Sequence, residues 1–142
     1  MKVMKPFALL VLVAVISCKK KEYTGKVWFS EPSDKAEVTS PVKFGMQVEG
    51  MTVKPAGAIE EGTGHFHILI NKEAIAAGQV VINDEFHKHY GKGQTEDTID
   101  LKPGDYRITL QFADGAHVSY GSAWSQTISL KVKAKAAGGE EE

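Results

Sequence analysis

The sequence predicts an all-β protein, an immunoglobulin-like β-sandwich of about seven strands, and two observations support this class. Short runs of alternating apolar and polar residues are separated by turn residues, and no segment has a strong apolar stripe at the helical period. The run from Leu101 to Leu110 also reads Leu-x-Pro-Gly-x-Tyr-x-Ile-x-Leu, which is typical of the penultimate strand of immunoglobulin-like domains. In those domains the tyrosine after the turn can hydrogen-bond back to the corner backbone. A cupin or jelly-roll barrel is the competing architecture, but the chain is short for it and lacks the paired acidic ligand.

The expected strands follow one another at short intervals. Apolar residues alternate at 27–29 and again at 42–48, where Pro41 suits the first position of a strand. Gly62-Thr63-Gly64 turns the chain into a strand that ends at position 70, and one helical turn is expected at 72–77, closed by Gly78. Further strands are expected at 95–101, 106–112 and 128–132, whereas the segments that carry the later histidines read as loops.

The N-terminal segment predicts export and lipid anchoring. Residues 1–5 carry two lysines, residues 7–16 are continuously apolar, and Ser17 follows, which together describe a secretory signal peptide. The apolar run is too short for a permanent membrane span, which needs ~20 residues. Val15-Ile16-Ser17-Cys18 resembles a bacterial lipobox, so we expect residues 1–17 to be removed and Cys18 to be lipidated. The expected location is the cell envelope, where Cys18 would hold the protein at a bacterial membrane.

The remaining chain divides into a polar tether at 18–25, one sandwich domain at 26–133 and a flexible acidic tail at 134–142. A formal net charge of −1 without a clustered basic face gives no indication of a nucleic-acid partner. Cys18 is the single cysteine, so once it is lipidated the mature chain has neither a disulfide nor a thiolate. Any metal site must therefore use histidine, carboxylate or methionine ligands.

The histidines are the most informative residues for function. Four of the five form two pairs of the same spacing: His65 and His67 are one His-x-His pair, and His87 and His89 are the other. His117 is the fifth and stands alone. On a strand, alternation places His65 and His67 side by side on one face. We expect this face to be the exposed side of a half-buried strand.

Imidazole pairs of this kind predict a metal site for copper or zinc, because imidazole nitrogen suits both ions. We expect a surface-exposed centre built on His65 and His67, with His87, His89 or His117 completing it. Other side chains offer further ligands. Met51 is a candidate thioether ligand, Met46 is assigned to the core, and Asp84 and Glu85 could ligate a metal or orient a histidine.

Four segments resemble one family, the uncharacterised bacterial domain of unknown function 4399. They run from Gly50 to Gly57, from Gly62 to Asn71, from His87 to Glu96 and from Leu110 to His117. The family carries three successive histidines where this chain has His-Phe-His, and alternation places position 66 in the core. The resemblance implies an exported β domain and supplies no activity.

Two functional classes follow from the sequence. In the first, an envelope lipoprotein binds copper or zinc through its histidines and takes part in metal handling in the periplasm. In the alternative, the histidines form a metal-free hydrogen-bond network in an immunoglobulin-like binding or adhesion module, whose protein partner is unknown. An enzyme is not predicted, because the chain has no nucleophile elbow, metalloprotease motif or dinucleotide fingerprint.

Overall fold

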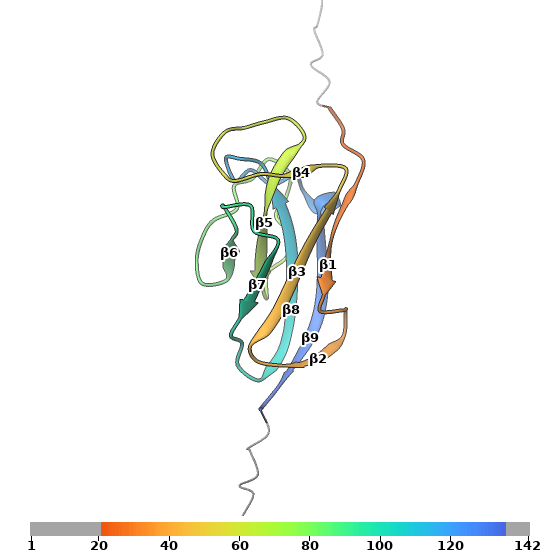
Figure 1. Ribbon diagram of the computed structural model, residues 1–142, viewed down its shortest axis with the longest axis vertical. Coiled ribbons are helices and arrows are strands. Elements are labelled where there is room, and N and C mark those ends of the chain that lie inside the picture. Colours follow the sequence, from red (N-terminus) through yellow and green to blue (C-terminus); the bar gives the residue numbers. More distant parts are fainter. Residues whose placement is uncertain (1–20, 136–142) are drawn as a thin grey trace, which may run out of the picture.

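The computed structural model describes residues 21–135, which form two β-sheets packed face to face (Figure 1). The smaller sheet is antiparallel and has the order β1 (Lys26–Glu31), β3 (Val42–Glu49) and β7 (Glu96–Ile99). The larger sheet has the order β2 (Ala36–Thr39), β9 (Ser125–Lys133), β8 (Gly104–Ala113), β5 (Thr63–Ile70) and β4 (Thr52–Val53). The sixth strand of this sheet, β6 (His87–His89), lies outside this order and pairs with β5. One 3-10 turn, η1 (Ser122–Trp124), precedes β9. The predicted β-sandwich is therefore confirmed.

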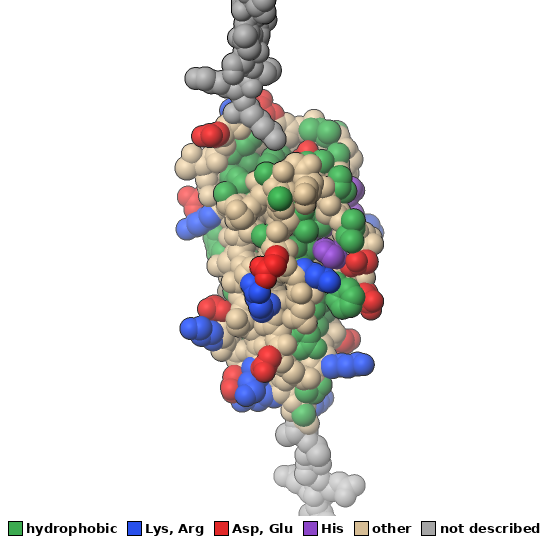
Figure 2. Space-filling view, turned by 180° about the vertical axis from the view of Figure 1, so that it is seen from behind, with side chains coloured by type: hydrophobic (Ala, Val, Ile, Leu, Met, Phe, Trp, Pro, Cys, Tyr) green, Lys and Arg blue, Asp and Glu red, His purple; other side chains and the backbone are tan. Residues whose placement is uncertain are grey.

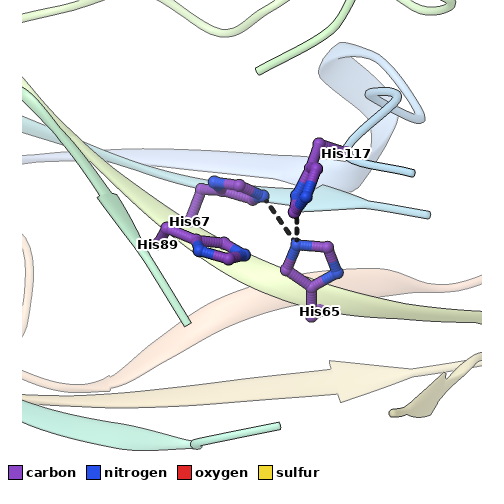
Figure 3. A group of neighbouring side chains, drawn as sticks. All are labelled: His65, His67, His89 and His117. Carbon is purple, nitrogen blue, oxygen red and sulfur yellow. Dashed lines mark hydrogen bonds between the residues drawn. The ribbon is translucent and has the colours of Figure 1, made fainter. Parts of the chain in front are cut away.

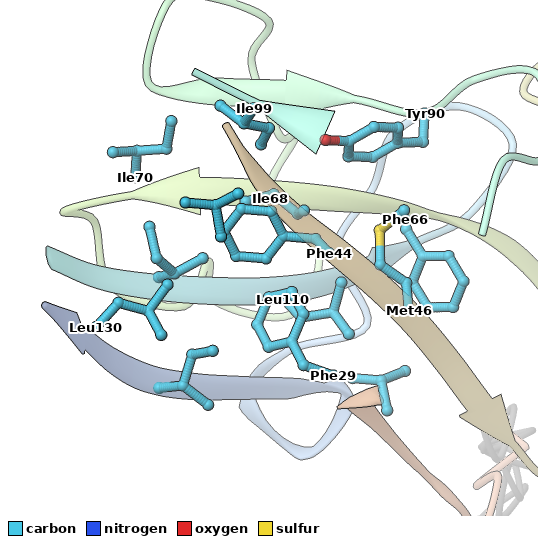
Figure 4. Close-up of a cluster of buried hydrophobic side chains, with 14 of the residues drawn as sticks. Phe29, Phe44, Met46, Phe66, Ile68, Ile70, Tyr90, Ile99, Leu110 and Leu130 are labelled. Carbon is cyan, nitrogen blue, oxygen red and sulfur yellow. The ribbon is translucent and has the colours of Figure 1, made fainter. Parts of the chain in front are cut away.

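The core fills the space between the two sheets (Figure 4). Alternation along β5 sends Phe66, Ile68 and Ile70 into this core, as predicted, and β8 contributes Ile108, Leu110 and Phe112. The facing sheet adds a second layer from β1, β3 and β7, which includes Phe29, Phe44, Met46 and Ile99. This packing makes β5 and β8 a rigid support for whatever their opposite face carries.

The corner before β8 has the contact that the sequence predicts. The Tyr106 hydroxyl donates a hydrogen bond to the carbonyl oxygen of Lys102 over 2.9 Å. Within residues 21–135, no helix is long and apolar enough to cross a bilayer. The predicted signal peptide, Cys18 and most of the predicted tail lie outside the described residues.

Two local predictions are wrong. Residues 72–77 form no helical turn, because side chains of β8 bind their backbone: Gln111 Oε1 accepts from Ile75 N, and Thr109 Oγ1 donates to Lys72 O. The second His-x-His pair lies on a strand, not in a loop, because β6 adds to β5 with His89 opposite His67 and His87 opposite Leu69.

Candidate metal centre

Four of the five histidines meet on the face of the larger sheet that points away from the core (Figure 3). His65 and His67 come from β5, His89 comes from β6, and His117 comes from the loop after β8. One nitrogen from each ring lies within 4.8 Å of the others. These four residues are called the histidine cluster below.

Strand register explains three of the four positions. His65 and His67 share a face because one residue separates them on β5. His89 is the direct cross-strand partner of His67, and side chains of such pairs stand next to each other. Their ring centroids are 5.1 Å apart, with the rings stacked.

A tight loop delivers the fourth histidine. His117 has a φ of 65°, a left-handed conformation that is uncommon for residues other than glycine. The side chain of Asp114 braces this loop, because its Oδ1 accepts from the backbone N–H groups of Ala116 and Val118, each over 2.9 Å. The His117 N–H also donates to the Asp114 carbonyl oxygen. An unfavourable backbone conformation held by three hydrogen bonds is the kind of local strain that collects at functional sites.

Hydrogen bonding among the rings converges on a single atom. His65 Nε2 lies 3.0 Å from His67 Nε2 and 3.1 Å from His117 Nδ1. A neutral ring nitrogen carries either one proton or one lone pair, so it can form only one good hydrogen bond. The arrangement therefore brings three nitrogens together more closely than hydrogen bonds alone can satisfy.

Other ring nitrogens in the cluster have no partner at all. His65 Nδ1, His67 Nδ1 and His89 Nε2 are buried without a hydrogen-bond partner within residues 21–135. A buried polar atom left unpaired costs about 1–3 kcal/mol. His65 and His67 direct their Nε2 atoms into the cluster, so their Nδ1 atoms would stay unpaired with or without a bound ion, and the crowding around His65 Nε2 is what distinguishes the two cases.

The four rings surround a common centre. Their six centroid separations span only 4.7–5.9 Å. In a planar square the two diagonals would exceed the sides about 1.4-fold, so the rings lie nearer the corners of a tetrahedron. Ligand nitrogens of a tetrahedral zinc site, each about 2.0–2.1 Å from the ion, lie about 3.4 Å apart, close to the two shortest contacts here.

Burial favours the uncharged form of three members of the cluster, His65, His67 and His89. Desolvation, followed by the neighbouring His89 and His117, lowers the pKa of His65 from 6.5 to about 4, although Asp114 acts in the opposite direction. Burial, followed by His65 and the other nearby imidazoles, lowers the pKa of His67 to about 2. Burial and then His117 also lower the pKa of His89. Neutral imidazole is the form that binds metal, so these three ligands need no deprotonation at neutral pH.

The prediction of a surface-exposed centre is wrong. The side chains of His65 and His67 are 0% and 1% exposed, and only small areas of histidine reach the surface in the view from behind (Figure 2). The segment 71–86 covers them, held by bonds from Val81 N to His117 O and from Ser119 Oγ to Ile75 O. His89 and His117 are half-buried.

His87 is the predicted site residue that the structure leaves out of the cluster. Its Nδ1 lies 2.6 Å from Asp84 Oδ1, which also accepts from the backbone N–H groups of Phe86 and His87. Asp84 therefore orients a histidine, as the sequence suggests, but that histidine is His87 and not a member of the cluster. Neither methionine joins the cluster, since Met46 lies in the core and Met51 packs against it.

Sequence reasoning missed two residues that shape the cluster. Asp114 fixes the His117 loop, and it lies just after the strand predicted at 106–112 without a predicted role of its own. Gly91 lies against His89, and a Cβ at position 91 would be 2.3 Å from the ring Cε1 and 2.5 Å from Nε2. A glycine two residues after a candidate ligand was the available signal for this close approach.

Comparison with known proteins gives one match. The family model described as "Domain of unknown function (DUF4399)" matches residues 42–133, a span that includes all five histidines. No curated protein and no solved structure matches the chain significantly.

Proposed function

The chain belongs to the DUF4399 family, and from this premise we propose that it is a metal-binding protein of the bacterial cell envelope. The histidine cluster would hold one zinc or copper ion, and the protein would take part in metal handling in the periplasm. We propose a binding role and no catalysis, because the sequence carries no catalytic signature.

One observation carries the proposal: four imidazole nitrogens lie within 4.8 Å of one another on a packed sheet. Hydrogen bonds satisfy this arrangement poorly, since His65 Nε2 faces two ring nitrogens at once. A cation that accepts four lone pairs satisfies it directly. Metal binding is therefore favoured over the alternative, a metal-free network in a binding or adhesion module.

The donor set narrows the choice of ion. Four nitrogen ligands suit zinc and copper, and the near-tetrahedral ring positions favour zinc, which takes four tetrahedral ligands in protein sites. Copper(II) binds nitrogen sites more tightly than zinc in general but prefers a tetragonal arrangement. We therefore expect zinc to bind with less displacement of the rings than copper(II).

Calorimetric titration of the metal-free protein with zinc and copper(II) tests the proposal. The wild type should bind one ion per chain, and the double variant His65→Ala/His67→Ala should lose tight binding while its β-type circular dichroism spectrum persists. His87→Ala is the matched control, because this histidine belongs to a motif of the same spacing but lies outside the cluster. Equal binding by the wild type and the double variant would refute the metal site.

The location is proposed from the sequence. Cys18 lies outside the described residues, and its lipobox-like context supports lipidation and attachment to a membrane. Cys18→Ala should shift the protein from the detergent phase to the aqueous phase in a partition assay. An unchanged distribution would contradict lipid anchoring and would leave the metal site unaffected.

A further inference from the structure

A cavity of about 420 Å³ opens directly onto the histidine cluster. Three members of the cluster, His67, His89 and His117, line it together with Val80, Val81, Ile82 and Asn83. His65 is the cluster member that does not line it. Three of the four candidate ligands thus face a space that reaches from the cluster toward the surface.

The shape of the cluster fixes the direction of this opening. The rings of His67, His89 and His117 form a triangle with centroid separations of 5.1, 4.7 and 5.9 Å. The His65 ring lies 4.7–5.1 Å from each of them, so it is the apex of the tetrahedron. Because the cavity adjoins the three base rings, it lies over the face opposite His65.

An ion held by the four rings would be accessible to a further ligand from the cavity, over the face formed by His67, His89 and His117. Zinc sites that accept a substrate or water keep a free position or expand from four to five ligands. A ligand that entered from the cavity would approach the ion over the face formed by the three base rings, on the side opposite His65. A closed structural site would instead have packed side chains over every face.

The cavity wall limits the class of ligand. The aliphatic side chains and the Asn83 amide in this wall carry no charge. Within residues 21–135, no lysine or arginine lines the cavity. A multiply charged anion such as phosphate has several strongly hydrated oxygens, and apart from the histidines this wall offers one hydrogen-bond donor, the Asn83 amide, to replace that water. A small neutral or singly charged ligand would lose less hydration on entering and would gain its bond to the ion.

We propose that this cavity is a binding site for a small neutral or singly charged ligand, which takes an exchangeable fifth position on the bound metal opposite His65. The inference rests on the proposed metal-binding function and goes beyond it, because it gives the centre an exchangeable position. The described chain supplies the apex ligand, the three base ligands and an entrance lined by Val80 and Ile82, which are 59% and 57% exposed.

The test uses the intact protein loaded with cobalt(II), a spectroscopic substitute for zinc, and sodium azide as the probe ligand. Azide should change the visible absorption from that of a four-coordinate to that of a five-coordinate ion, and the change should saturate. Phosphate at the same concentration should leave the spectrum unchanged. An absence of any azide effect, or an equal effect of phosphate, would overturn the proposal.

A variant that blocks the entrance separates this inference from the metal site. Ile82→Trp should weaken azide binding at least tenfold while cobalt still binds. Ile59→Trp is the matched control, because Ile59 is also an exposed isoleucine, 69% exposed, but does not line this cavity. Azide binding that Ile82→Trp leaves unchanged would contradict the assigned route. Failure of the wild type to bind cobalt or zinc at all would instead refute the proposed function, and this inference with it.

Discussion

Gly91 shows how a residue without a side chain can position a candidate ligand. The His89 ring lies where a Cβ at position 91 would stand, only 2.3–2.5 Å from two ring atoms. Contacts below 3.0 Å force one group to move, and the ring is the mobile partner. The backbone at this position therefore sets where His89 points.

Gly91→Ala should displace the His89 ring and weaken zinc binding to the level of His89→Ala, with little loss of fold stability. Calorimetry and thermal unfolding measure the two effects. Gly78→Ala is a useful control, since Gly78 has open space around it and only its φ of 83° opposes the change. Gly91→Ala with wild-type zinc affinity would show that the glycine does not position the ligand.

At the scale of single residues, the sequence predicts that histidines form a site but not which histidine of the second pair joins it. His-x-His on a strand was sufficient to pair His65 with His67, because alternation depends on position alone. His87 and His89 have the same spacing, yet Asp84 binds one ring and the cluster takes the other. That division depends on the contacts of β6, which no local pattern encodes.

At the scale of elements, strands β5 and β8 are buried on both faces, which their sequences do not predict. Both alternate between apolar and polar residues, which predicts one buried and one exposed face. Every residue of β5 is buried, and Thr109 and Gln111 of β8 are 0% exposed, because segment 71–86 packs over the predicted outer face. The sequence predicted a helical turn at 72–77, and nothing local indicates that this segment will lie across a sheet. The three-residue strand β6 was missed for the same reason, since only its pairing with β5 defines it.

Gln111 fastens this cover to the sheet. Its Oε1 accepts from Ile75 N over 3.0 Å, and its Nε2 donates to the carbonyl oxygens of Gly121 and Trp124 over 3.1 and 3.2 Å. Gln111→Leu keeps the approximate volume but leaves these buried backbone groups unpaired, so it should lower the free energy of unfolding by about 2–4 kcal/mol. Urea unfolding of metal-free protein measures this. Gln47→Leu, on an exposed position of β3, should change it by less than about 0.5 kcal/mol. Equal effects of the two variants would contradict the bracing role.

The stability of the whole molecule should fall in mild acid. The folded-state pKa values of His65 and His67, about 4 and about 2, lie below the ordinary 6.5. As pH falls below 6.5, the unfolded chain therefore takes up protons that the folded chain does not. Stability is unaffected above this range. It is lost from about pH 6.5 down to about pH 4 for His65 and down to about pH 2 for His67, at about 1.4 kcal/mol per pH unit for each histidine.

Urea unfolding of the metal-free protein at pH 7, 6 and 5 measures this loss. His67→Gln should show a smaller loss between pH 7 and 5, because it removes one of the three histidines whose pKa is lowered in the folded state. Gln47→Leu is the control that should keep the full dependence, since position 47 is exposed on β3 and carries no titratable group. Wild-type stability that is equal at pH 7 and pH 5 would contradict neutral burial of the cluster.

Across the whole molecule, the cluster joins three segments that are distant in sequence: β5, β6 and the loop at 114–118. A bound ion would fasten all three to the larger sheet, and the folded state would gain stability from every ligand that the unfolded chain cannot supply together.

X-ray absorption spectroscopy of the zinc-loaded protein tests the four-histidine centre most directly. The account predicts a first shell of four nitrogen ligands at about 2.0–2.1 Å, with the outer-shell scattering of imidazole rings. His117→Ala should lower the imidazole count by one, and His87→Ala should leave it at four. A shell dominated by oxygen, two or fewer imidazoles, or a wild type that retains no zinc after desalting would contradict the account.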